Sequence, residues 1–67
     1  MNVNELRAEM FRRGVKASDA AGRLGISPST LYRKMRGKSE FFQSEIIGLS
    51  EMLELDNDRI MAVFFNR

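Results

Sequence analysis

Residues 17–36 read ASDAAGRLGISPSTLYRKMR, and this stretch decides the fold. Small and aliphatic residues recur at helical spacing on both sides of a glycine: Ala20, Ala21 and Leu24 before Gly25, and Leu31 and Met35 after it. Ser27-Pro28 is a strong helix start, because serine caps an N-terminus well and proline has no N–H to lose at the first helical position. We therefore predict two short helices, over residues 17–24 and 28–36, joined by a tight turn.

An amphipathic helix is predicted before this pair, beginning near Val3 and capped by Asn2 or Asn4. Its apolar stripe is Val3, Leu6, Met10 and Phe11. Its polar face is Glu5, Arg7, Glu9, Arg12 and Arg13. Gly14 ends it, because glycine takes a positive φ without steric cost.

Two more helices are predicted after the pair, over residues 43–54 and 56–65, the second capped by Asp56. Their buried stripes are Ile46, Leu49 and Leu53, then Ile60, Val63 and Phe64, with Phe41 as a core anchor between the helix pair and the fourth helix. Residues 60–65 would also suit a strand by composition, but no other segment offers a strand to pair with. The expected fold is all-α, a compact bundle of about five short helices forming one domain, residues 1–67.

Composition excludes several function classes. The 67 residues include no cysteine and no histidine, so a zinc or copper site, a disulfide and a Ser-His or Cys-His nucleophile are not expected. The nine carboxylates show no acid–base pairing, and no glycine-rich phosphate loop is present. We expect no enzyme activity, cofactor, metal or small-molecule substrate. No apolar run is long enough to span a bilayer, and the charged N-terminus is not a signal peptide, so we expect a cytoplasmic protein.

Charge is divided unevenly along the chain. Residues 1–38 hold nine Lys/Arg and three acids, a net charge of +6, whereas residues 39–67 hold two basic residues and six acids, a net charge of −4. Such asymmetry predicts a basic face turned toward a polyanion and an acidic face turned away. The alternative is that both halves are simply solvated.

The two central helices fit a helix-turn-helix, in which the second helix enters the DNA major groove. Four positions carry the match: Ala21 allows close helix approach, Gly25 opens the turn, Ile26 pins the turn to the core, and Leu31 anchors the second helix. Together with the basic charge and the five-helix layout, the motif predicts a sequence-specific regulator that binds double-stranded DNA.

At this point the chain resembles the DNA-binding domain of phage lambda-type repressors and Cro proteins, over nearly its whole length. The resemblance rests on Leu6, Met10 and Gly14, on LGISPSTLYRKMRGK over residues 24–38, and on Phe41, Glu45-Ile46, Leu53 and Leu55. The ending, with Ile60 and Phe64-Phe65, is similar to small prophage regulators of Gram-positive bacteria.

The resemblance and the side-chain chemistry together imply a set of DNA contacts. The expected base contacts are Ser27, Pro28, Ser29, Thr30 and Arg33. The expected backbone contacts are Lys16, Ala17, Ser18, Tyr32, Lys34, Arg36 and Lys38. Many relatives have Gln where Ala17 stands, and Pro28 offers only packing against a thymine methyl. The alternative for Arg33 is a solvent-exposed helix charge or a pair with a nearby acid, and the alternative for Arg36 and Lys38 is plain solvation.

Relatives of this kind usually dimerise, so that two-fold related half-sites lie one helical turn apart. The candidate dimer surface is Ile47, Met52, Met61, Phe64 and Phe65, and the alternative is that these side chains only complete a small core. A second function also stays open at this stage: a helical protein-interaction module that works through its acidic and apolar C-terminal half.

Overall fold

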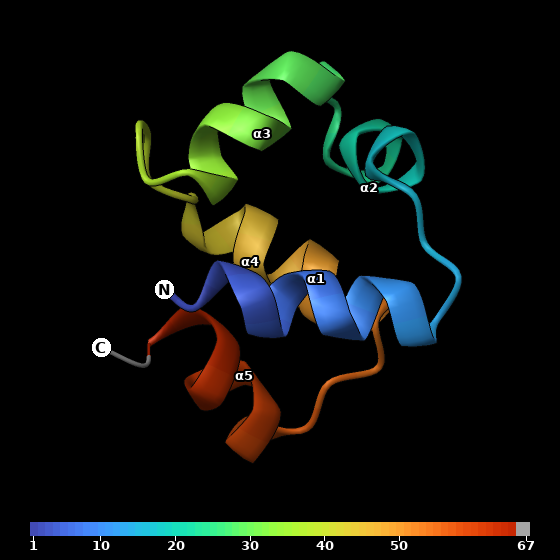
Figure 1. The fold of residues 1–67 in the computed structure, drawn as a ribbon, viewed down its shortest axis with the longest axis vertical. Helices are drawn as coiled ribbons and strands as arrows, with labels where there is room; N and C mark the ends of the chain where they lie inside the picture. Colours follow the sequence, from blue (N-terminus) through green and yellow to red (C-terminus); the bar gives the residue numbers. More distant parts are fainter. Residues whose placement is uncertain (66–67) are drawn as a thin grey trace.

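A computed structural model describes residues 1–65 of the chain, which form five helices (Figure 1). They are α1 (Val3–Arg12), α2 (Ala17–Leu24), α3 (Pro28–Met35), α4 (Gln43–Met52) and α5 (Asn57–Phe64). The all-α prediction is therefore confirmed, and residues 60–64 are helical rather than a strand. The fourth helix ends two residues earlier than predicted, at Met52.

Three helices begin where the sequence offers a side-chain cap. Asn2 Oδ1 accepts the Glu5 N–H at 3.2 Å, so Asn2 rather than Asn4 caps α1. Ser27 Oγ caps α3 by accepting the Thr30 N–H at 3.1 Å, and Asp56 caps α5 by accepting the Arg59 N–H. Each cap pairs a backbone donor that the helix itself cannot satisfy.

The turn after α2 needs a left-handed residue, and Gly25 supplies it with φ 71°. The Gly25 N–H donates to Gly22 O, and the Ile26 N–H donates to Ala21 O at 3.0 Å. This is the Schellman pattern, which reverses the chain within two residues. The same pattern ends α4 at Glu54, which adopts φ 54° although it is not glycine.

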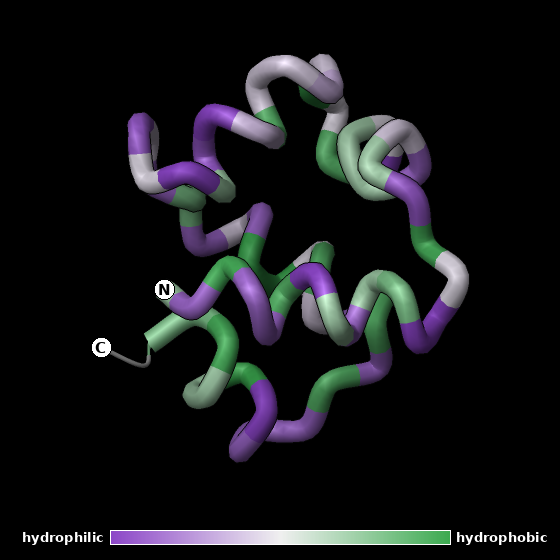
Figure 2. Tube along the Cα trace, in the orientation of Figure 1, coloured by the Kyte–Doolittle hydropathy of each residue, from purple (hydrophilic) through white to green (hydrophobic). Residues whose placement is uncertain are grey.

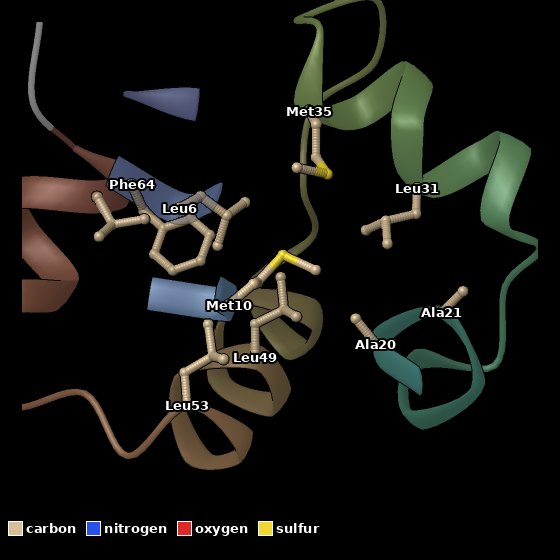
Figure 3. Close-up of a cluster of buried hydrophobic side chains, with 10 residues drawn as sticks. Leu6, Met10, Ala20, Ala21, Leu31, Met35, Leu49, Leu53 and Phe64 are labelled. Atoms are coloured by element: carbon tan, nitrogen blue, oxygen red, sulfur yellow. The ribbon is translucent and has the colours of Figure 1, made fainter. Parts of the chain in front are cut away.

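The core takes one large aliphatic side chain from most of the elements (Figure 3). The fully buried large residues are Leu6, Leu31, Leu49, Leu53 and Val63. The buried residues of α2 are Ala20 and Ala21, and their small side chains let α2 pack directly against α3 and α4. α1 packs against α5, so the two ends of the described chain close the bundle opposite the helix-turn-helix (Figure 1).

The sequence left Phe64 as either a core residue or part of a dimer surface. It is 7% exposed and packs edge-to-face on Phe41, with ring centroids 5.8 Å apart, so it belongs to the core. Phe41 is thereby confirmed as a core anchor. The prediction that Phe11 belongs to the buried stripe of α1 was wrong, because its side chain is 88% exposed. Phe11 directly follows the buried Met10, and consecutive side chains of a helix point in different directions, so Phe11 faces away from the core.

Candidate nucleic-acid interface

α2 and α3 form the predicted helix-turn-helix at one end of the molecule (Figure 1). Ala21 and Leu31 are buried between the helices, and Ile26 packs against the core from the turn. Hydropathy follows this division: the outer side of α3 is polar, whereas apolar residues gather where the helices meet (Figure 2). The motif positions expected to hold the two helices together therefore do so.

The expected base contacts lie at the start of α3 and one turn later. Ser27, Pro28, Ser29 and Arg33 are exposed, and Thr30 is half-buried. The Ser27 hydroxyl is already engaged, since it accepts the Thr30 N–H and donates to Thr30 Oγ1 at 3.0 Å. Ser29 and Arg33 are therefore the exposed polar side chains best placed to form new hydrogen bonds here.

The expected backbone contacts surround these residues. Lys16 and Ser18 are exposed at the start of α2, and Ala17 between them is half-buried. Tyr32, Arg36 and Lys38 are exposed on α3 and on the loop that follows it. The fold thus brings the two segments that resemblance assigns to phosphate contacts onto the flanks of α3.

Lys34 corrects the prediction, because its side chain is 6% exposed and does not reach the surface. Its Nζ lies 2.7 Å from Glu45 Oε1 and 4.0 Å from the centroid of the Phe42 ring. The reason is its place on α3: Lys34 lies on the edge that packs against the start of α4, not on the outer face. Lys34 therefore does not serve as a phosphate contact in this structure.

Burial by itself would raise the pKa of the Glu45 carboxyl, but hydrogen bonds outweigh it and hold that pKa below its usual value. The donors are the Lys34 ammonium and the Phe42 N–H, the second at 2.8 Å. Glu45 is therefore ionised near neutral pH, and it ties α3 to the N-terminus of α4.

Ion pairs engage five of the ten Lys/Arg side chains within residues 1–65. Glu9, Glu51 and Glu54 engage Arg12, Arg23 and Arg13 respectively. Arg59 pairs with both Glu5 and Glu9 across the α1–α5 contact. Within residues 1–65, the Lys/Arg side chains left without an ion pair are Arg7, Lys16, Arg33, Arg36 and Lys38.

Four of these five unpaired cations lie on or beside the helix-turn-helix, and the fifth, Arg7, lies on α1. The sequence showed the charge asymmetry but could not show which charges are neutralised, since partners such as Arg13 and Glu54 lie 41 residues apart. Pairing by the C-terminal acids thus leaves the unpaired positive charge near α2 and α3.

The candidate dimer residues are divided by the structure. Ile47, Met61 and Phe65 are exposed, whereas Met52 packs against the core and Phe64 lies within it. Ile47 and Phe65 line a groove of about 710 Å³ between α4 and α5, together with Phe41, Gln43, Ile46, Ser50, Glu51, Glu54, Leu55 and Ile60. This largely apolar groove lies away from the outer face of α3.

A family profile described as a helix-turn-helix domain matches residues 3–62, nearly the whole chain. The chain therefore belongs to the helix-turn-helix domain family, a class of DNA-binding proteins, as the sequence predicted. No curated protein and no solved structure gives a significant match. None of the helices within residues 1–65 is long and apolar enough to cross a membrane.

Proposed function

We propose that this protein is a sequence-specific transcriptional regulator of the phage or prophage Cro/repressor type, with α3 in the major groove of double-stranded DNA. The observation that carries the proposal is the distribution of unpaired charge. Lys16 precedes α2, Arg33 and Arg36 lie on α3 and at its end, and Lys38 follows. Three of the six acids of the C-terminal half, Glu45, Glu51 and Glu54, are engaged by other cations. A positive surface around an exposed helix suits a phosphate backbone.

Direct reading of sequence falls to few side chains. Arg33 can donate two parallel hydrogen bonds to O6 and N7 of guanine, the commonest specific contact. Ser29 adds a short donor and acceptor, and Pro28 offers apolar contact with a thymine methyl. Lys16, Arg36 and Lys38 position the protein by neutralising phosphates, which carry no base identity.

We also propose that two copies of the protein associate through the α4–α5 groove and together bind a pseudo-palindromic operator. Ile47 is 50% exposed and Phe65 is 54% exposed on this groove, and Met61 on α5 is 58% exposed. This is a larger exposed apolar surface than a small monomer needs. Pairing through this groove would leave both copies of α3 free for half-sites one helical turn apart. Phe64 takes no part in this surface, because it is already buried.

Selection of bound duplexes from a random DNA pool tests the proposal directly. We expect one enriched half-site, repeated in inverted orientation, and an affinity that falls steeply as salt rises. Sedimentation of the wild type and of Ile47→Asp, with and without the selected duplex, tests the dimer. A folded sample that binds no duplex at low salt would overturn DNA binding and leave the protein-interaction module, with the apolar α4–α5 groove as its binding surface.

A further inference from the structure

α1 carries two different charge faces. Glu5 and Glu9 face α5, where Arg59 binds both and Arg12 adds a second partner for Glu9. Arg7 takes no part in this network, is exposed, and forms no ion pair within residues 1–65. Phe11 follows Arg7 by four residues, so both side chains lie on the same face of α1.

Arg7 and Phe11 border a small groove between α1 and the helix-turn-helix. The groove measures about 220 Å³, and its other lining residues are Met10, Val15, Ala17, Tyr32 and Met35. No lining residue is acidic, and Arg7 is the one cation among them. The groove therefore joins α1 to two residues, Ala17 and Tyr32, at which the DNA backbone is expected.

We propose that α1 is a third DNA-contacting element, in which Arg7 binds a backbone phosphate on the Ala17 side of α3 and Phe11 packs against the adjoining deoxyribose. The proposal rests on the proposed DNA-binding function. Ala17 has no side-chain donor, so a phosphate beside the start of α2 needs its charge partner from another element. Arg7 is the unpaired cation of the same groove, and the 88% exposed Phe11 ring is the apolar surface beside it.

Salt dependence of binding measures such a contact. Each phosphate neutralised contributes about 0.9 to the slope of log affinity against log salt concentration, which is about 3.5-fold in affinity between 50 and 200 mM KCl. We expect Arg7→Ala to lower the slope by about 0.9 on the selected duplex and on an unrelated duplex alike. Phe11→Ala should weaken binding while leaving the slope unchanged, because a phenyl ring displaces no counterion.

Arg13→Ala is the matched control, since it removes the same charge from the end of α1 but from a side chain already paired with Glu54. Its slope should stay that of the wild type. Circular dichroism establishes that all three variants are folded at the temperature of the titration. Duplexes with one neutral methylphosphonate then locate the contact: one position should weaken wild-type binding and leave Arg7→Ala unaffected.

The outcomes separate cleanly. Equal slopes for Arg7→Ala and Arg13→Ala would overturn the α1 contact, because Arg7 would then add only to the overall field. A wild-type affinity for DNA that survives this result would keep the proposed function intact. A wild type without DNA affinity would instead remove the function itself, and with it the contact.

Discussion

The Lys34 ammonium and the Glu45 carboxylate form a buried ion pair that joins α3 to α4, with Nζ and Oε1 2.7 Å apart and both side chains less than 10% exposed. Glu45 Oε1 also accepts the Phe42 N–H, and the Phe42 ring covers the ammonium. The same oxygen of Glu45 thus accepts a hydrogen bond from the backbone at the start of α4 and another from the Lys34 side chain of α3. A buried ion pair, in addition to apolar packing, therefore fixes the position of α3 relative to α4.

Removing one partner of this pair should destabilise the fold strongly. Lys34→Met leaves Glu45 buried without its counter-charge, and such a loss costs about 3 kcal/mol or more, a large part of the stability of so small a domain. The double change Lys34→Met with Glu45→Leu should recover part of this loss, since an apolar pair of similar volume leaves no charge unpaired, whereas the Phe42 N–H still loses its acceptor. Urea unfolding of the two variants measures the difference, and equal destabilisation would contradict the interpretation.

Acid should weaken the fold through the same carboxylate and through Glu9. Burial alone would raise the pKa of Glu9, but the hydrogen bonds from Arg59 and Arg12 lower it by more than burial raises it. The pKa values of Glu9 and Glu45 therefore both lie below 4.5 when the protein is folded. Carboxyls with a lowered folded-state pKa stabilise fully above their unfolded value, and this stabilisation is lost as pH falls through the folded value. We expect the free energy of unfolding to be level above pH 5 and to drop below pH 4.5.

Glu9→Gln provides the comparison for this pH effect. The variant should be less stable than the wild type at pH 7. The gap between their free energies of unfolding should narrow at pH 3, which lies below the unfolded-state pKa of 4.5, because the unfolded wild type then binds a proton at Glu9 more readily than the folded wild type does. Urea unfolding at a series of pH values records the gap. A gap that stays constant between pH 7 and pH 3 would show that the Glu9 charge contributes nothing to stability.

Much of the fold was predictable because its signals are local. Caps such as Ser27 and Asp56, the left-handed Gly25 and the apolar spacing of α3 act within a few residues, and all were found at the predicted places. What failed depends on distant partners. Lys34 reads as a surface cation in sequence, and only the approach of Glu45, 11 residues away, turns it into a buried one.

The candidate site was predictable in the same uneven way. The exposure of Ser29 and Arg33 follows from the helical spacing of Leu31 and Met35 on the opposite side of α3. The role inferred for Arg7 had no local signal, because a cation on the polar face of α1 looks like any solvated residue. Its isolation becomes visible only when Arg59 engages the acids of α1 from the far end of the chain.

Two helical glycines should respond differently to alanine. Gly22 lies in an exposed part of α2 where an added Cβ meets nothing within 4 Å, so Gly22→Ala should stabilise the fold by about 0.5–1 kcal/mol. A Cβ at Gly48 would lie 3.0 Å from Leu24 Cδ2, where α4 packs against α2. Gly48→Ala should therefore gain less than Gly22→Ala or lose stability. Thermal unfolding ranks the two variants, and an equal gain would show that the Leu24 side chain moves aside at no cost.

Arg33 is the residue on which sequence reading should depend most. Arg33→Ala is expected to cost about 1–3 kcal/mol on the selected duplex and much less on random DNA, because it removes a two-pronged guanine contact. Arg33→Lys should recover little of the discrimination, since a lysine ammonium is a point charge without the planar fork. Arg36→Ala is the comparison, and its loss should be nearly the same on both duplexes, as for a phosphate contact. Anisotropy titrations at fixed salt give the ratio of the affinity for the selected duplex to that for random DNA, for the wild type and for each of the three variants. Equal losses on both duplexes for Arg33→Ala would place Arg33 on the phosphate backbone and leave base reading to Ser29.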